Sequence, residues 1–184
     1  MAITKESIEK KLEKIKERQD IKAYKSKQTV FLMTSRFNTK TREENKIFRE
    51  RGWPDGCLYC SPTEVSQSIP PLAIMIVLEM DNDKNQIFAV GRCENRSFLN
   101  KYKLYEDQNY NRYNYVGKKR IERENFNSTE EAVFKALDQL CFYGNEHMKR
   151  GNGIKSFTTK LLVNCKHVLD IPAFINNMFT SRFS

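Results

Sequence analysis

The sequence predicts an α+β fold, in which strand-like runs alternate with helices that begin at recognisable capping residues. Residues 28–35 and 72–80 are β-rich or apolar runs typical of strands, whereas residues 128–143 repeat apolar side chains at helical spacing. With 184 residues, of which 39% are hydrophobic, the chain can bury one good-sized core. We therefore expect one main domain over residues 28–184, preceded by a basic helix within residues 1–27.

The N-terminal segment is expected to form an amphipathic helix over residues 4–24. Thr4 is a candidate N-cap, and Ile8, Leu12 and Ile15 fall on one narrow apolar stripe. Such a thin stripe does not suit the centre of a domain, so we expect the helix to lie at the edge of the domain or against a partner. A lysine-rich helix that serves only solubility is the alternative.

The first half of the main domain is predicted to run strand, helix, strand. After the strand over residues 28–35, Thr41 and Glu44 have the spacing of a capping box, and Gly52 stands where a helix C-cap glycine is expected. A second short strand is expected over residues 56–61.

The centre of the domain is predicted to be an antiparallel hairpin. Residues 72–80 form a continuous apolar run, which is typical of a strand covered on both faces, and after a polar turn residues 86–93 return as its partner. The hairpin runs directly into three hydrogen-bond donors, Arg92, Asn95 and Arg96. They are expected to face a bound ligand or, alternatively, to satisfy carbonyls of the loop that follows.

The second half is predicted to hold a polar loop over residues 97–111 and a basic strand over residues 112–123, in which Gly117 marks a bulge. A core helix is expected to follow, opened by a capping box of Ser128 and Glu131. Its apolar face is predicted to hold Ala132, Val133, Ala136, Leu137, Leu140 and Cys141. A strand over residues 160–165 and a terminal helix capped by Asp170 are expected to complete the chain.

Composition argues against a membrane protein and against a secreted one. The longest apolar run is far shorter than the roughly 20 residues that span a bilayer, and the charged N-terminus lacks the apolar centre of a signal peptide. Five cysteines at irregular spacings fit a reducing compartment. We expect an intracellular protein of the cytoplasm or nucleus with no membrane partner.

Motifs for catalysis or cofactor binding are not found. Cys57 and Cys60 have the spacing of half a zinc site, but no second pair exists, and within a strand the two thiols point to opposite faces. The chain has no nucleophile elbow, Walker loop or dinucleotide-binding glycine motif, and its carboxylate pairs lie in first helical turns, where capping explains them. We therefore expect no enzyme activity, no metal and no other cofactor.

The charge pattern instead indicates a polyanionic partner. The net charge of +9 is concentrated in basic segments on both sides of a neutral stretch over residues 28–100. Tyr113 and Tyr115 precede basic residues, so aromatic faces could stack on bases while cations meet phosphates. Lys118 and Arg120 are expected to share an exposed face. The alternative is a half-buried strand with tyrosines in the core and solvated lysines.

A second candidate anion site is the segment KRGNGIK, in which basic side chains surround two glycines. A simple connection whose glycines provide positive φ is the alternative. Together, the residues expected to contact RNA or DNA are Arg36, Arg92, Asn95, Arg96, Tyr113, Tyr115, Lys118, Lys119, Arg120, Lys149, Arg150 and Lys155.

The order of these elements, and above all the hairpin MIVLEMDNDKNQIFAVGRCENR, resembles the PUA-like group of small mixed β-barrels with flanking helices, which includes the EVE, ASCH and YTH families. The sequence is also similar to uncharacterised proteins of large DNA viruses. The resemblance implies binding of nucleic acid and, as in several members, acceptance of a modified base into an aromatic pocket. Such a pocket would be lined by Phe31, Ser35, Asn38, Trp53 and Tyr59, although this chain has one tryptophan where YTH domains use several.

The sequence therefore predicts a non-catalytic nucleic-acid-binding module, with the reading of a modified base as its finer form. The alternative is a structural or interaction protein, viral and internal to the virion, which docks on a protein partner or self-associates through residues 4–24.

Overall fold

The computed structural model describes residues 5–52 and 55–183, which form five α-helices and two separate β-sheets. The predicted α+β class is confirmed. Two residues with predicted roles, Thr4 and Trp53, lie outside the described residues. Of the described helices, none is both long and apolar enough to cross a membrane.

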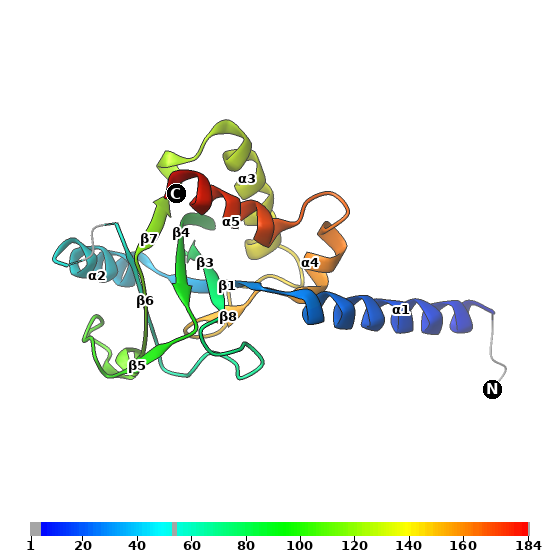
Figure 1. Cartoon of the computed structure of the whole chain (residues 1–184), viewed down its shortest axis with the longest axis horizontal. Coiled ribbons are helices and arrows are strands. Elements are labelled where there is room, and N and C mark those ends of the chain that lie inside the picture. The colour runs from blue at the N-terminus through cyan, green and yellow to red at the C-terminus, as the bar shows by residue number, and fades with distance from the viewer. Residues whose placement is uncertain (1–4, 53–54, 184) are drawn as a thin grey trace.

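The elements follow one another in the order shown in Figure 1. They are α1 (Lys5–Lys27), β1 (Val30–Phe37), α2 (Thr39–Glu50), β2 (Cys57–Ser61), β3 (Ile74–Asp81), β4 (Gln86–Glu94), β5 (Ser97–Leu99), the short 3-10 helix η1 (Gln108–Asn111), β6 (Tyr113–Gly117), β7 (Lys119–Glu122), η2 (Arg123–Asn125), α3 (Ser128–Phe142), β8 (Lys155–Ser156), α4 (Thr159–Cys165) and α5 (Ile171–Arg182).

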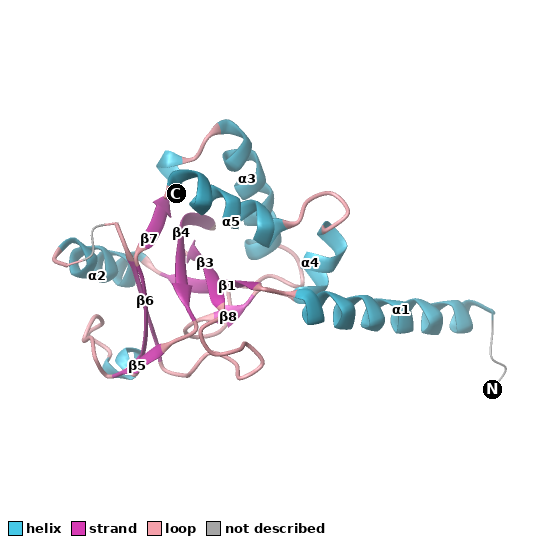
Figure 2. Ribbon diagram, in the orientation of Figure 1, coloured by secondary structure: helices cyan, strands magenta, loops and turns pink. Residues whose placement is uncertain are grey.

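The larger sheet has the strand order β7-β4-β3-β1-β8, and the smaller sheet has the order β2-β6-β5. Strand β1 runs parallel to β3, while β3 and β4 form the predicted antiparallel hairpin at the centre. Helices α3 and α5 cover one face of the larger sheet, and the smaller sheet packs with α2 on the other side (Figure 2).

Strand β3 is buried on both faces, as its continuous apolar run predicts. Ile76 and Leu78 belong to the core under the helices, whereas Met75 and Val77 belong to the core between the two sheets. Side chains alternate along a strand, so β3 supplies both cores at once.

The described strands do not close into a barrel, because the basic segment predicted as one strand is divided between the sheets. Strand β6 pairs with β2 and β5, and after Lys118 strand β7 pairs with β4. Gly117 stands at this transfer, where one strand ends before the next begins, and is not the predicted bulge within a continuous strand. A Cβ atom there would lie 2.1 Å from the carbonyl oxygen of Arg92 and 2.6 Å from the Sγ of Cys57. The close approach of the two sheets therefore requires a glycine.

The helix over residues 159–165 replaces a predicted strand. A short apolar run fits about two turns of helix as well as it fits a strand, and local sequence does not distinguish the two. Packing decides for the helix here, since Leu162 is buried and Lys160 lies 2.8 Å from Glu17 of α1.

Two predicted capping boxes are shifted toward the N-terminus, by three residues and by one. The side chain of Asn38, and not that of Thr41, caps α2 by accepting from the Thr41 N–H at 2.8 Å. Likewise Asn127, and not Ser128, caps α3. Asparagine and serine are both good N-caps, so a register error of this kind is expected from sequence.

The apolar face of α3 is confirmed in part. Leu137 and Cys141 are buried and Val133 and Leu140 are half-buried, as predicted, but Ala132 and Ala136 are exposed, and the buried face includes Phe134 and Asp138 instead. Three other predictions agree with the structure. The terminal helix is capped by Asp170 as predicted, the expected N-terminal helix is α1, and the expected loop over residues 97–111 holds only the short elements β5 and η1.

Replacing Gly117 by alanine should lower the free energy of unfolding by about 2 kcal/mol or more, because the new methyl group overlaps backbone atoms that cannot rotate away. Chemical denaturation measures this change. The control is Gly52→Ala, where nothing lies within 4 Å of the added Cβ, and it should shift stability by no more than about 0.5 kcal/mol. Equal stability of the two variants would contradict the close crossing of the sheets.

Candidate functional site

A pocket of about 570 Å³ opens where β4 ends and where the chain passes from β6 to β7. Four basic side chains line it, together with one carboxylate and one aromatic ring: Arg92, Arg96, Lys118, Lys119, Glu94 and Phe98. These residues come from two separate stretches, 92–98 and 118–119, so the pocket exists only in the folded chain.

Strand pairing brings the basic residues together. In the register of β4 and β7, Arg92 lies opposite Lys119, and Lys118 occupies the junction between the two sheets. Arg96 follows the end of β4 in the turn toward β5. The glycine at position 117 lets the junction approach the Arg92 backbone, and the cations of both strands therefore converge.

The pocket carries an excess of positive charge that the described residues do not neutralise. Arg92, Arg96 and Lys118 make no side-chain hydrogen bond or ion pair to a described residue, and the Nε of Arg92 is buried without an acceptor there. Leaving such a donor without a partner costs about 1–3 kcal/mol. The side chains that line the pocket therefore carry a net positive charge, with four cations against one carboxylate.

Two further contacts shape the site. The Nζ of Lys119 donates to the carbonyl oxygen of Phe183 at 3.0 Å, which fixes one cation at the wall. The ring of Phe98 lies 5.4 Å from the Arg96 guanidinium carbon and 4.4 Å from the Nζ of Lys101. Burial raises the pKa of the Cys93 thiol, which also lines the pocket, so this group is uncharged at neutral pH and leaves the positive potential intact.

Of the residues predicted to contact nucleic acid, Arg92, Arg96, Lys118 and Lys119 meet in this pocket. Arg120, predicted to be exposed beside Lys118, does not. It is buried and forms an ion pair with Glu79, so the prediction of a shared exposed face is wrong.

Tyr115 is also buried, which contradicts its expected role in stacking on bases. Its hydroxyl oxygen accepts a hydrogen bond from the Val65 N–H at 2.9 Å. Tyr113 is half-buried beside Arg112. For these tyrosines the alternative interpretation, a half-buried strand, describes the structure better.

The Asn95 side chain hydrogen-bonds to backbone carbonyl groups and does not line the pocket. Its Nδ2 donates to the carbonyl oxygens of Ile69 at 2.9 Å and Pro70 at 3.1 Å. Arg36 has a similar role, since its Nε donates to the carbonyl oxygen of Met148 at 2.7 Å. Both donors hold loops against the larger sheet.

The segment KRGNGIK forms a connection whose glycines adopt positive φ, with values of 104° at Gly151 and 66° at Gly153. Lys149 donates to the Oδ1 of Asn85 at 2.7 Å, while Arg150 and Lys155 are exposed. This segment does not line the pocket at the junction of the sheets.

The residues expected to form a base pocket do not line a common pocket within the described part of the chain. Ser35 and Tyr59 are buried, Phe31 is half-buried on β1, and the side chain of Asn38 is used in capping α2. Trp53 lies outside the described residues.

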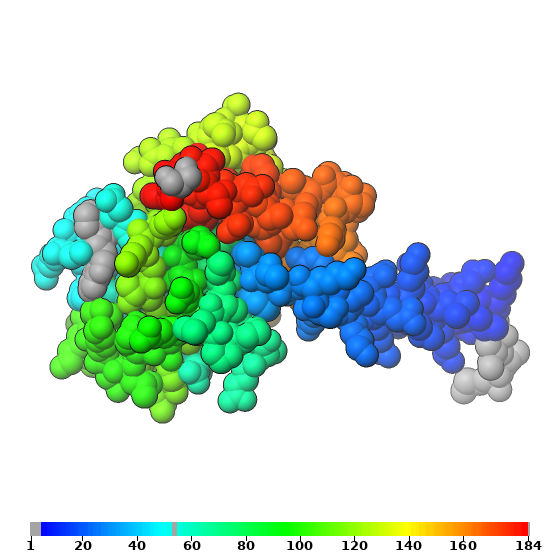
Figure 3. Space-filling view, in the orientation of Figure 1, coloured from blue at the N-terminus to red at the C-terminus, as the bar shows by residue number. Residues whose placement is uncertain are grey.

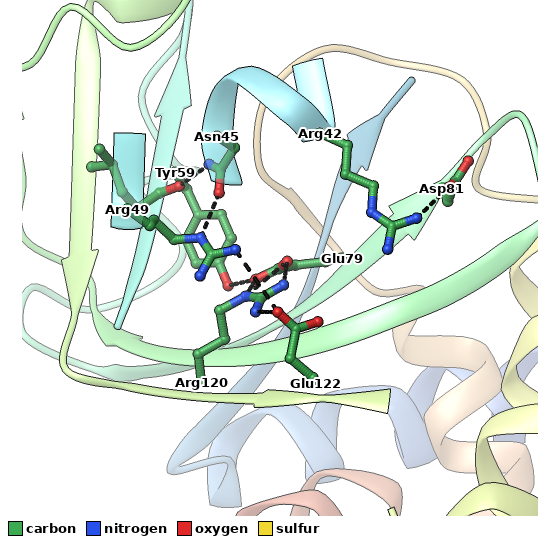
Figure 4. A network of polar contacts seen from close by, with 9 residues as sticks. Arg42, Asn45, Arg49, Tyr59, Glu79, Asp81, Arg120 and Glu122 are labelled. Carbon is green, nitrogen blue, oxygen red and sulfur yellow. Dashed lines mark hydrogen bonds and ion pairs between the residues drawn. The ribbon is translucent and has the colours of Figure 1, made fainter. Parts of the chain in front are cut away.

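A buried polar network lies between the larger sheet and β2 (Figure 4). The Nε and Nη2 of Arg120 each donate to Glu79 at 2.8 Å, and the hydroxyl of Tyr59 donates to the same carboxylate at 2.8 Å. Gly91 makes room for this contact, because a Cβ atom there would lie 1.9 Å from the Tyr59 hydroxyl oxygen.

Helix α2 joins the network through its buried face. The Nε of Arg49 donates to the Oδ1 of Asn45 at 2.8 Å, and the Nδ2 of Asn45 donates to the carbonyl oxygen of Leu58. Arg49 also lies 3.9 Å from Glu122, which contacts Arg120. The network therefore connects α2, β2, β3 and β7.

Burial by itself would raise the pKa of Glu79, but the Arg120 guanidinium beside it reverses this effect and holds the pKa below its ordinary range. Burial raises the pKa of the Tyr59 hydroxyl. Glu79 is therefore a charged acceptor and Tyr59 a neutral donor at neutral pH. The network is satisfied internally and holds the fold together rather than presenting a ligand site.

Sequence reasoning missed both Glu79 and Phe98. A single carboxylate within the apolar run of β3 was the available signal for a buried ion pair, because an isolated buried charge requires a partner. Phe98 stood in a segment predicted as loop, two residues after Arg96.

Comparison of the chain with protein-family models, with curated proteins and with solved structures finds no significant match. The resemblance to PUA-like domains and to viral proteins therefore stays a prediction. Within the described residues, no group of three or more histidine, cysteine or acidic side chains is arranged to hold a metal ion.

Replacing Glu79 by glutamine should lower the free energy of unfolding by about 3 kcal/mol, because Arg120 would remain buried with only the half-exposed Glu122 as a counter-charge. Denaturant titration followed by circular dichroism gives this value. The matched control is Glu106→Gln, which removes an exposed ion pair with Lys40 and should change stability barely measurably. A small effect of Glu79→Gln would show that Arg120 finds another acceptor.

Acid should act on the same pair. Because the pKa of Glu79 is lower in the folded chain than its ordinary value of 4.5, its ionised form stabilises the fold above that pH, and this contribution is lost as the pH falls through the folded pKa. Between about pH 5 and pH 3 the wild-type chain should lose more free energy of unfolding than Glu79→Gln does. Parallel pH curves for the two chains would contradict this assignment.

Proposed function

We propose that this chain is a non-catalytic module that binds single-stranded nucleic acid at the pocket formed by Arg92, Arg96, Lys118 and Lys119. The observation that carries the proposal is the convergence of these four cations in one concave site, three of them without an acceptor among the described residues. Phosphate oxygens are strong acceptors for arginine and lysine.

The aromatic ring and the volume of the pocket favour a single-stranded nucleic acid over a duplex. Phe98 provides an aromatic ring within reach of two cations, and such a combination suits a base that stacks while its phosphate is held nearby. A volume of about 570 Å³ accommodates a nucleotide-sized group.

The finer form of the proposal is that the chain belongs to the PUA-like group and distinguishes a modified base. Its support is the resemblance of the β3–β4 hairpin. The residues first expected to line a base pocket do not converge among the described residues, so a base would be received beside Phe98 at the junction of the sheets.

The double variant Arg96→Gln/Lys118→Gln tests the site. Both side chains lie on the rim and are exposed, so the fold should persist, while affinity for a mixed-sequence single-stranded oligonucleotide should fall. Each lost phosphate contact flattens the salt dependence of binding by about 0.7, so the slope of log K against log salt should decrease by about 1.4. Fluorescence anisotropy over a salt series measures both quantities.

Lys46→Gln/Lys135→Gln is the matched control, because it removes the same charge from exposed positions on α2 and α3. It should keep the wild-type slope. An identical loss of affinity in the two double variants would show that only net charge matters, and the pocket would then not be the binding site.

A further inference from the structure

Helix α1 projects from the body of the protein as a rod (Figure 3). Two contacts with the rest of the chain are made from its C-terminal half. Glu17 pairs with Lys160 at 2.8 Å, and the Tyr24 ring lies 5.2 Å from the Nζ of Lys166. No described residue of α1 is fully buried.

The apolar stripe of α1 faces away from these contacts. Ile8, Leu12 and Ile15 are 47%, 60% and 50% exposed. Glu17 and Tyr24 follow Ile15 by two and nine residues, which at about 3.6 residues per turn places them on the opposite side of the helix. The domain therefore holds one face of α1 and leaves the apolar face uncovered among the described residues.

The spacing of the stripe is that of a coiled-coil seam. Ile8, Leu12 and Ile15 are separated by four and then three residues, the d-a-d pattern of a heptad repeat. Helices that lie in a membrane surface need a broad apolar face and a large amphipathic asymmetry, whereas this seam is one side chain wide. A partner helix fits it better than a lipid surface.

The charges beside the seam define the partner. In this register the flanking e and g positions are Glu9, Lys11, Lys16 and Arg18, three of which are basic. The ion pairs of α1 within the described residues involve Glu6 with Lys10 and Glu17 with Lys160, so these three cations remain available.

A second copy of the same helix is a poor occupant. In a parallel pair Lys11 would face Lys16 of the other copy. In an antiparallel pair Lys11 would face Arg18, and the contact of Glu9 with Lys16 would only offset that repulsion, so neither arrangement gains net attraction from the charges beside the seam. Like charges across such a seam disfavour pairing.

We propose that α1 is a docking helix for a partner protein, and that the partner contributes an amphipathic helix with an apolar seam flanked by acidic side chains. The partner helix would cover Ile8, Leu12 and Ile15 and pair its carboxylates with Lys11, Lys16 and Arg18. This interaction is separate from the pocket between the sheets, because α1 contributes no residue to that pocket.

The probe for this proposal is a fluorescent synthetic helix with leucine at a and d and glutamate at e and g, titrated with the full chain. The wild type should bind it, and Leu12→Ser/Ile15→Ser, which alters only exposed positions, should weaken binding by about tenfold or more. Lys11→Glu/Lys16→Glu should weaken it to a similar extent.

The control variant Lys10→Glu/Lys14→Glu changes the net charge by the same amount away from the seam and should reduce affinity less than about threefold. Circular dichroism checks that α1 stays helical in each variant. Arg96→Gln/Lys118→Gln should bind the probe as the wild type does, which separates this surface from the pocket.

Several outcomes would overturn the proposal. They are a wild type that does not bind the probe even at high micromolar concentration, equal losses in the seam and control variants, and loss of binding on changing the pocket. Seam-dependent binding to phosphatidylserine vesicles without binding to the peptide would assign α1 to membranes. Seam-dependent dimerisation in sedimentation would assign it to self-association.

Discussion

The ion pair between Glu79 and Arg120 is the interaction on which the arrangement of the two sheets depends. Both residues belong to the larger sheet. The Glu79 carboxylate also accepts a hydrogen bond from the hydroxyl of Tyr59, which belongs to the smaller sheet. Two charges buried in a protein interior are tolerated only when each is paired and hydrogen-bonded. The pair thus requires that β2, β3 and β7 keep one relative position.

Glycines at two positions make that arrangement sterically possible. Gly91 leaves space for the Tyr59 hydroxyl, and Gly117 lets the chain cross from one sheet to the other against the Arg92 backbone. The same crossing carries Lys118 and Lys119 to the end of β4, where Arg92 and Arg96 already lie. The close contact of Gly117 with the Arg92 backbone therefore both fixes how the two sheets meet and brings the cations of the pocket together.

The basic character of the chain is divided between surfaces with different geometry. The pocket is concave and concentrates cations around a small volume, which suits phosphate groups on a flexible strand. Helix α1 is convex and places cations beside an apolar seam, which suits another helix. Cations buried elsewhere, such as Arg120 and Arg49, serve stability and add little to the external field.

Local sequence determined the elements whose signals are contained within a few residues. The apolar run of β3 and the turn after it predicted the central hairpin, Asp170 predicted the start of α5, and the stripe through Leu12 predicted an amphipathic helix at the edge of the domain. In each case hydrophobic spacing or a capping side chain acts over one or two turns of chain, so the neighbouring residues suffice.

Tertiary structure alone decided which side of each element is covered. Arg120 and Lys118 are both basic residues of one short segment. Arg120 is buried in an ion pair with Glu79 of β3, whereas Lys118 is exposed to solvent. The division of the basic segment at Gly117 and the helical state of residues 159–165 likewise depend on partners far away in the chain. Burial of a charge is set by its counter-charge across the core, and no local pattern contains that partner.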